Sequence, residues 1–86
     1  MDLLKSAMDA FQIPQDTAVR YSYLQICGNH QVKLENYTRM IDYSPNRLLL
    51  QCKTCQIEIC GKELQILRYS SQELLLDGVI QKVMFL

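Results

Sequence analysis

An internal repeat is the feature that most restricts what this chain can fold into. Residues 31–52 are echoed by residues 56–78: QVKLENY corresponds to QIEICGK, and MIDYSPNRLLLQC corresponds to ILRYSSQELLLDG. Each copy reads as an alternating strand, a turn, a strand ending in Tyr-Ser, a second turn and a strand built on three leucines. Short strands that recur in this way predict a mainly β module of two similar three-strand units.

The stretches outside and between these strands complete the predicted sheet. Gly28-Asn29 fits a two-residue hairpin turn, because both residues tolerate positive φ. Residues 61–63 and 77–78 have the composition of further turns, so separate strands are expected on either side of each. We therefore predict a small antiparallel β sandwich or roll. A short β-solenoid-like coil is the alternative, since a repeat of about 25 residues also occurs in solenoids.

The N-terminal residues predict an amphipathic helix. Leu4, Met8 and Phe11 share one face, and Pro14 ends the pattern because the residue before a proline is pushed out of the α region. The helix can pack on the β domain, or dock on a partner or a membrane surface, and both interpretations stay open. The predicted organisation is a helix at residues 1–12, a connector at 13–22 and a β domain at 23–86.

The leucine triplets predict a second apolar face. Strand alternation points Leu48 and Leu50 to the core and Leu49 to the opposite side, and Leu75 holds the corresponding place in the second copy. The candidates for this interaction surface are Leu49, Leu67, Leu75, Ile80, Met84 and Leu86. Either the N-terminal helix covers this face or a partner binds it, since exposed apolar patches mark interaction sites.

Composition excludes several classes of protein. Nine basic residues balance nine acidic ones, which removes the electrostatic footprint of a nucleic-acid binder. No apolar run approaches the roughly 20 residues of a membrane-spanning helix, and the first residues lack a signal-peptide pattern. We expect a cytoplasmic protein with reduced cysteines. A chain of 86 residues is also small enough for self-association or a partner to support its stability.

Three cysteines are the candidates for a metal or redox site. Cys52 and Cys55 have the spacing of one zinc knuckle, but Cys60 lies within a predicted strand and no second knuckle follows. A redox pair would need a helix N-terminus to lower the thiol pKa, whereas this pair flanks a predicted turn. His30 has no nucleophile or acid beside it. The sequence thus predicts neither an enzyme nor a cofactor. A small cysteine-based metal-binding or redox protein is the alternative.

An ordered set of short motifs runs along nearly the whole chain. The motifs are Ile13-Pro14-x-Asp16, Leu24-x-Ile26-x-Gly28-Asn29, Val32-x-Leu34-Glu35-Asn36-Tyr37, Ile41-x-Tyr43-Ser44, Ile57-x-Ile59-x-Gly61-Lys62-x-Leu64, Leu74 to Gly78, and Val83-x-Phe85-Leu86. Taken together they resemble the YabP/YqfC family of sporulation proteins, and within it the YqfC-like branch. Tyr23 departs from that pattern, because a proline is expected ahead of the first strand, and Cys55 stands where glycine is common.

The resemblance implies a protein of endospore-forming bacteria that acts in the mother cell during sporulation and has no known enzymatic activity. It also implies a partner, a membrane protein of the same sporulation programme. We therefore expect a non-enzymatic protein that works through protein–protein interaction. It would lie in the cytoplasm on the mother-cell side and meet a membrane only through its partner.

Overall fold

A computed structural model describes residues 21–86. The expected helix at residues 1–12, with Leu4, Met8 and Phe11, lies outside the described residues. The described chain forms six strands: β1 (Tyr23–Cys27), β2 (Gln31–Glu35), β3 (Arg39–Ser44), β4 (Arg47–Gln51), β5 (Gln56–Tyr69) and β6 (Glu73–Phe85). They form one sheet in the order β1-β2-β6-β5-β4-β3, with every pair of neighbours antiparallel.

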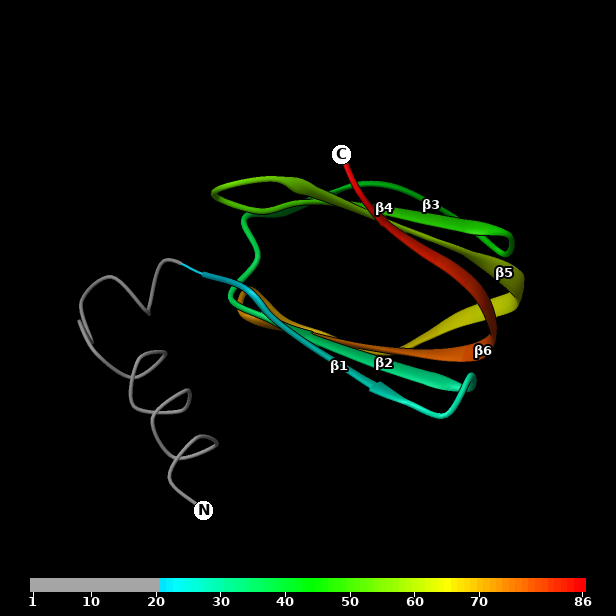
Figure 1. Cartoon of the computed structure of the whole chain (residues 1–86). Coiled ribbons are helices and arrows are strands. Elements are labelled where there is room, and N and C mark those ends of the chain that lie inside the picture. The colour runs from blue at the N-terminus through cyan, green and yellow to red at the C-terminus, as the bar shows by residue number, and fades with distance from the viewer. Residues whose placement is uncertain (1–20) are drawn as a thin grey trace, which may run out of the picture.

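Two long strands carry this single sheet round into two layers. β5 and β6 pair with each other through most of their length and bend together (Figure 1). The lower layer contains β1, β2, the first half of β6 and the second half of β5. The upper layer contains β3, β4, the first half of β5 and the second half of β6 (Figure 1). The predicted sandwich or roll is confirmed. A solenoid would pair the two triplet strands β4 and β6 in parallel, and these strands are not neighbours in the sheet.

Two predicted turns are bends within continuous strands. Residues 61–63 lie inside β5, and residues 77–78 lie inside β6. Register shifts at Cys60/Gly61 and Lys62/Gln65, with φ of 53° at Glu63 and 141° at Gly78, curve the pair without separating it. The prediction of separate strands is wrong here, because each strand has a partner that bends with it and keeps the ladder paired.

The first hairpin is confirmed, with a loop one residue longer than expected. Residues 28–30 connect β1 to β2, and Gly28 has a φ of 58°. The His30 N–H donates to the Cys27 carbonyl at 3.3 Å. His30 therefore belongs to the loop and does not open the next strand.

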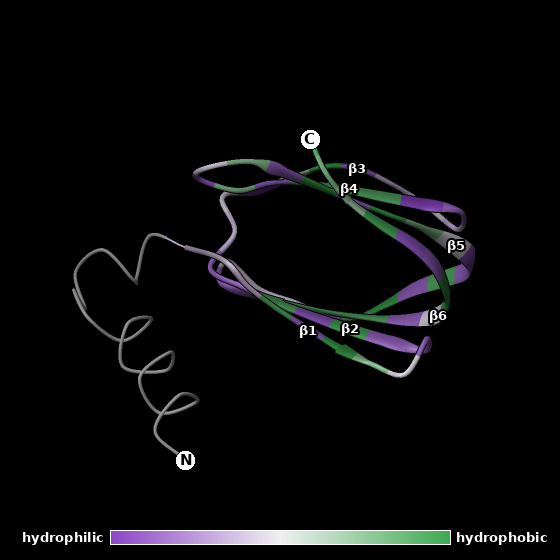
Figure 2. Ribbon diagram, in the orientation of Figure 1, coloured by the Kyte–Doolittle hydropathy of each residue, from purple (hydrophilic) through white to green (hydrophobic). Residues whose placement is uncertain are grey.

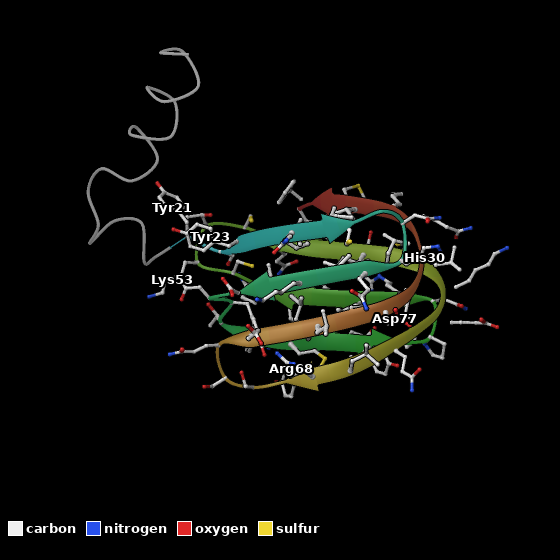
Figure 3. All side chains as sticks on the ribbon, turned by 90° about the horizontal axis from the view of Figure 1, so that it is seen from below. Tyr21, Tyr23, His30, Lys53, Arg68 and Asp77 are labelled. Carbon is white, nitrogen blue, oxygen red and sulfur yellow. The ribbon has the colours of Figure 1, made fainter. Side chains whose placement is uncertain are left out.

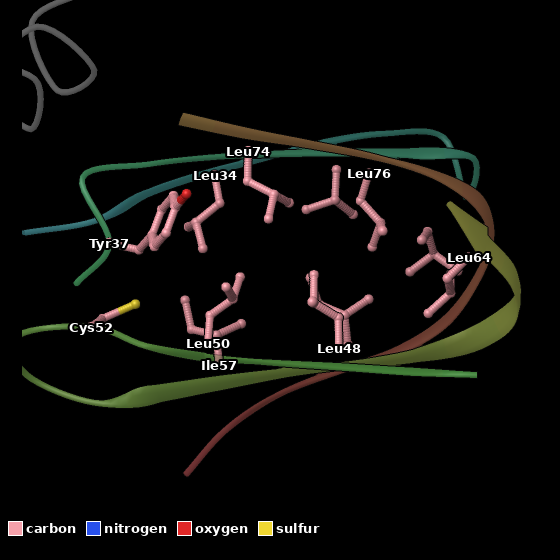
Figure 4. Close-up of a cluster of buried hydrophobic side chains, with 12 residues drawn as sticks. Leu34, Tyr37, Leu48, Leu50, Cys52, Ile57, Leu64, Leu74 and Leu76 are labelled. Atoms are coloured by element: carbon pink, nitrogen blue, oxygen red, sulfur yellow. The ribbon is translucent and has the colours of Figure 1, made fainter. Parts of the chain in front are cut away.

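The core fills the space between the two layers. Leu34, Leu74 and Leu76 project from the lower layer toward Leu48 and Leu50 of the upper layer (Figure 4). Apolar and polar residues alternate along much of the strands, which places one side chain in two in this core (Figure 2). The first and last leucines of each triplet therefore point into the core, as predicted.

The sequence repeat corresponds to an exchange of strands between its two copies. The first strand of each copy pairs with the last strand of the other: β2 pairs with the start of β6, and the start of β5 pairs with β4. The registers agree residue by residue, since Lys33 lies opposite Leu75 as Glu58 lies opposite Leu49. The bulge after Met40 recurs in β5 at the corresponding place. Each copy thus completes the sheet of the other around one shared core.

Candidate interaction surfaces

The structure divides the residues predicted for the second apolar face among three places. Leu49 and Met84 lie on the outer side of the upper layer, and Leu86 follows them at the end of β6. Leu75 lies on the outer side of the lower layer, next to a bulge in β5 that contains Leu67. They do not form one surface.

Ile80 is in the core, and its assignment to the outer face is wrong. Cys60 pairs with Lys82 whereas Gly61 pairs with Ile80, so β6 has one extra residue, Gln81, at this point. An extra residue changes the phase of strand alternation. Counting back in steps of two from Met84 therefore gives the wrong side for Ile80.

An ion-pair network surrounds Leu49. Asp42 and Glu58 lie opposite it on the two neighbouring strands. The Arg47 Nε lies 2.5 Å from Glu58 Oε2, and Arg47 Nη1 lies 3.3 Å from Asp42 Oδ2. Leu49 is only 9% exposed although it points away from the core. Long charged side chains cover apolar neighbours with their aliphatic parts, and Leu49 offers little surface to a partner.

A network of opposite sign surrounds Leu75. Lys33 and Arg68 lie opposite it on the two neighbouring strands. Glu73 joins them, with Oε2 3.3 Å from Lys33 Nζ and Oε1 3.0 Å from Arg68 Nη1. Leu75 remains partly exposed, so the lower layer presents an apolar side chain between two cations. Arg68 is labelled on this layer in Figure 3.

The two networks correspond through the sequence repeat, with every charge reversed. Asp42 corresponds to Arg68, Arg47 to Glu73 and Glu58 to Lys33. The same geometry therefore places a central cation between two carboxylates on one layer and a central carboxylate between two cations on the other. Exposed pairs of this kind contribute little to stability. Each outer face also carries a further charge beside its network: Glu35 Oε2 lies 3.3 Å from Lys33 Nζ, and the charge of Lys82 helps to lower the pKa of Glu58.

These contacts shift the pKa values of both glutamates. The hydrogen bond from Arg47 lowers the pKa of Glu58, and the hydrogen bonds from Arg68 and Lys33 lower the pKa of Glu73. The same pairing raises the pKa of Lys33 and of Arg47. All of these groups stay charged at neutral pH, so both networks persist there.

The four cysteines lie in different environments. Cys27 is exposed on β1, Cys52 is buried, and Cys55 and Cys60 are partly exposed, all as free thiols. Burial raises the pKa of the Cys52 thiol, which opposes the thiolate that metal binding and redox exchange require. Within residues 21–86, no three His, Cys, Asp or Glu side chains gather as metal ligands. The metal-binding alternative is not supported.

The tyrosines at equivalent places in the repeat are bound into the fold. Tyr43 donates its hydroxyl to the Leu64 carbonyl at 2.7 Å. Tyr69 stacks on Tyr37, with ring centroids 6.1 Å apart. The Tyr37 hydroxyl donates to the Ser70 carbonyl, and burial together with Tyr69 raises the pKa of Tyr37 to about 12. Tyr37 and Tyr69 therefore lie at one end of the core, and Tyr43 lies at the other end, where Leu64 is (Figure 4).

The open edges of the sheet were not predicted. β1 and the second half of β6 lie along one side of the two layers, and β3 and the second half of β5 along the other (Figures 1 and 3). Ile26 points to the inner side of β1 but is 46% exposed, because β1 is the last strand there. The alternation of side chains along a strand predicts the side of the sheet to which a residue points. It does not predict whether another strand lies beside that strand. The one available signal was the lack of charged residues in β1.

Comparison with known proteins gives one family and one relative. A model of the YabP family matches residues 19–86. "Uncharacterized protein YqfC" of Bacillus subtilis (strain 168) is 29% identical over 76 residues, which cover 88% of this chain and 82% of that protein. No solved structure matches the chain. In the part of the chain that the structure describes, no helix is long and apolar enough to cross a membrane.

Proposed function

This chain belongs to the YabP family, and from this we propose that it is a non-enzymatic sporulation protein of the mother-cell cytoplasm. In this proposal it binds a membrane-associated protein of the same sporulation programme. The binding surface is the outer side of the lower layer around Leu75.

A difference between two equivalent surfaces supports this choice. On the upper layer, Leu49 is covered by its ion-pair network, and Ile41 at the bulge is partly buried. On the lower layer, Leu75 stays partly exposed, and Leu67 at the corresponding bulge is 50% exposed. Two surfaces with the same backbone pairing thus differ in how much apolar area they leave open. Exposed apolar area beside charged groups is typical of interaction sites.

The charges around Leu75 indicate the chemistry of the partner. The side chains of Lys33 and Arg68 are 39% and 64% exposed. Arg68 contacts Glu73, and Lys33 contacts both Glu73 and Glu35. A partner segment with an apolar side chain flanked by carboxylates would fill the space over Leu75 and meet both cations. Such charge complementarity favours association and the correct orientation of the partner.

The test combines binding and sporulation in one set of variants. Tagged wild-type protein should capture a membrane-associated protein from sporulating cells, and deletion of its gene should lower spore yield. Leu75→Glu should abolish capture and fail to restore sporulation while the domain stays folded. Met84→Lys is the matched control, because it places a charge on the upper layer opposite Glu58 and leaves the proposed surface intact.

Two results would contradict the proposal. Normal spore yield in the deletion strain would remove the sporulation role. Full capture and complementation by a folded Leu75→Glu protein would remove the surface. Circular dichroism of each purified variant separates loss of binding from loss of folding.

A further inference from the structure

β1 is the least protected edge of the described sheet. It ends the sheet among residues 21–86, and a strand with one neighbour directs alternate backbone N–H and C=O groups away from the sheet. The usual protections are charged residues, proline and bulges. β1, with the sequence YLQIC, has none of these and pairs with β2 in unbroken register. β3 and the second half of β5 carry bulges, and the second half of β6 contains Lys82.

The apolar core is also incomplete at β1. Leu24 packs against the core and lies opposite Leu34, which is fully buried. Ile26 lies opposite the fully buried Val32 on the same side of the sheet but remains 46% exposed. One more strand beside β1 would cover Ile26 and continue the core by one layer of side chains.

The sequence of β1 fits a second copy of itself. Antiparallel pairing centred on Gln25 puts Gln25 opposite its own copy, Leu24 opposite Ile26, and Tyr23 opposite Cys27. Both Leu24–Ile26 pairs then lie on the inner side, where each covers an exposed isoleucine. No charges meet across this pairing, and the formal net charge of zero means that two copies do not repel each other.

We propose that two copies of this chain associate through an antiparallel β1–β1 pair centred on Gln25. The pair joins the lower layers of the two copies into one continuous sheet, related by a twofold axis at Gln25. One short strand pair is a small interface, so the dimer is weak and depends on protein concentration. The interface is an edge of the sheet and adjoins the outer face around Leu75 at Lys33, which lies opposite Gln25. The inference does not rest on the proposed function.

Two opposite charges at Gln25 provide the test. In the full chain, Gln25→Lys and Gln25→Glu should each raise the dimer Kd by about tenfold or more, because like charges meet at the twofold axis. An equimolar mixture of the two variants should dimerise again, since lysine then lies opposite glutamate. Sedimentation velocity over a concentration series measures all three samples.

The residue that lies opposite Gln25 within one chain distinguishes an effect on the folded monomer from an effect on the dimer. Lys33 lies opposite Gln25 in β2, so within a single chain Gln25→Lys is repelled and Gln25→Glu is attracted. A purely internal effect would therefore distinguish the variants, whereas the proposed pair makes both dissociate. Gln65→Lys is the control on the opposite edge, where residue 65 is exposed and lies opposite Asp77. It should dimerise like the wild type.

Three results overturn the inference. A wild-type chain that stays monomeric throughout the series shows that β1 is covered by another segment or by a different partner. A mixture that fails to dimerise rules out the pairing centred on Gln25. If Gln65→Lys dissociates the dimer and the Gln25 variants do not, the interface lies at the second half of β5 and not at β1. Leu75→Glu should still dimerise, so this inference and the proposed function can fail independently.

Discussion

At the scale of single residues, the reversed charges around Leu49 and Leu75 predict different responses to one substitution. Leu49→Glu would place a carboxylate in a 9%-exposed site between Asp42 and Glu58, and should destabilise the domain by roughly 3 kcal/mol or more. Leu75→Glu would lie between two cations in a partly exposed site, and should cost about 1 kcal/mol or less. Urea unfolding measures both. If Leu75→Glu destabilises the domain as much as Leu50→Glu, position 75 belongs to the core.

Tyr37 predicts a loss of stability at alkaline pH. Its pKa is about 12 in the folded chain and 10.0 for an ordinary tyrosine, so the unfolded chain releases this proton first as pH rises. The contribution of Tyr37 to the free energy of unfolding is complete below its pKa in the unfolded chain. It is lost as the pH rises through its pKa in the folded chain. Tyr37→Phe cannot titrate, so the stability of the wild type relative to the variant should fall between about pH 10 and pH 12. A constant difference in the unfolding free energy would contradict the assignment.

At the scale of elements, the joint bend of β5 and β6 depends on two glycines that pack against the opposite strand. A Cβ at Gly61 would lie 1.9 Å from the Val79 carbonyl oxygen, and one at Gly78 would lie 2.7 Å from the Glu63 carbonyl oxygen. Gly61→Ala should therefore cost roughly 3 kcal/mol or more, because backbone has to move. Gly28→Ala is the control: its φ is 58° but nothing lies within 4 Å, so about 1 kcal/mol is expected. Equal effects in thermal unfolding would show that the bend tolerates a Cβ.

At the scale of the whole molecule, the exchange of strands between the repeat copies predicts that neither copy folds alone. β2 needs the start of β6, and the start of β5 needs β4, so a cut in the exposed loop at Lys53 separates both pairs. Fragments 1–53 and 54–86 should each lack sheet structure by circular dichroism, and the intact chain should unfold in one cooperative transition. A folded isolated fragment would show that the copies are independent units.

The sequence alone determined the features that depend on near neighbours. Alternation assigned the sides of the triplet strands, because the side-chain period of a strand is two residues whatever its partner. The turns between β3 and β4 and between β5 and β6 were also predictable. Ser44 and Ser70 occupy the same place in each and accept hydrogen bonds from the N–H groups of Asn46 and Gln72. The same hydroxyl chemistry at the same spacing produces the same turn twice.

Only the tertiary structure decided the features that depend on which strands become neighbours. Residues 61–63 and 77–78 have the composition of turns. They form bends within continuous strands instead, because β5 and β6 stay paired with each other there. Gln81 changes the phase of β6 only because β5 shifts register there, which moved Ile80 into the core. Exposure of Ile26 follows from the place of β1 at the end of the sheet. The order of strands in the sheet depends on contacts between segments that are far apart in the chain. The two-residue alternation along one strand does not determine that order.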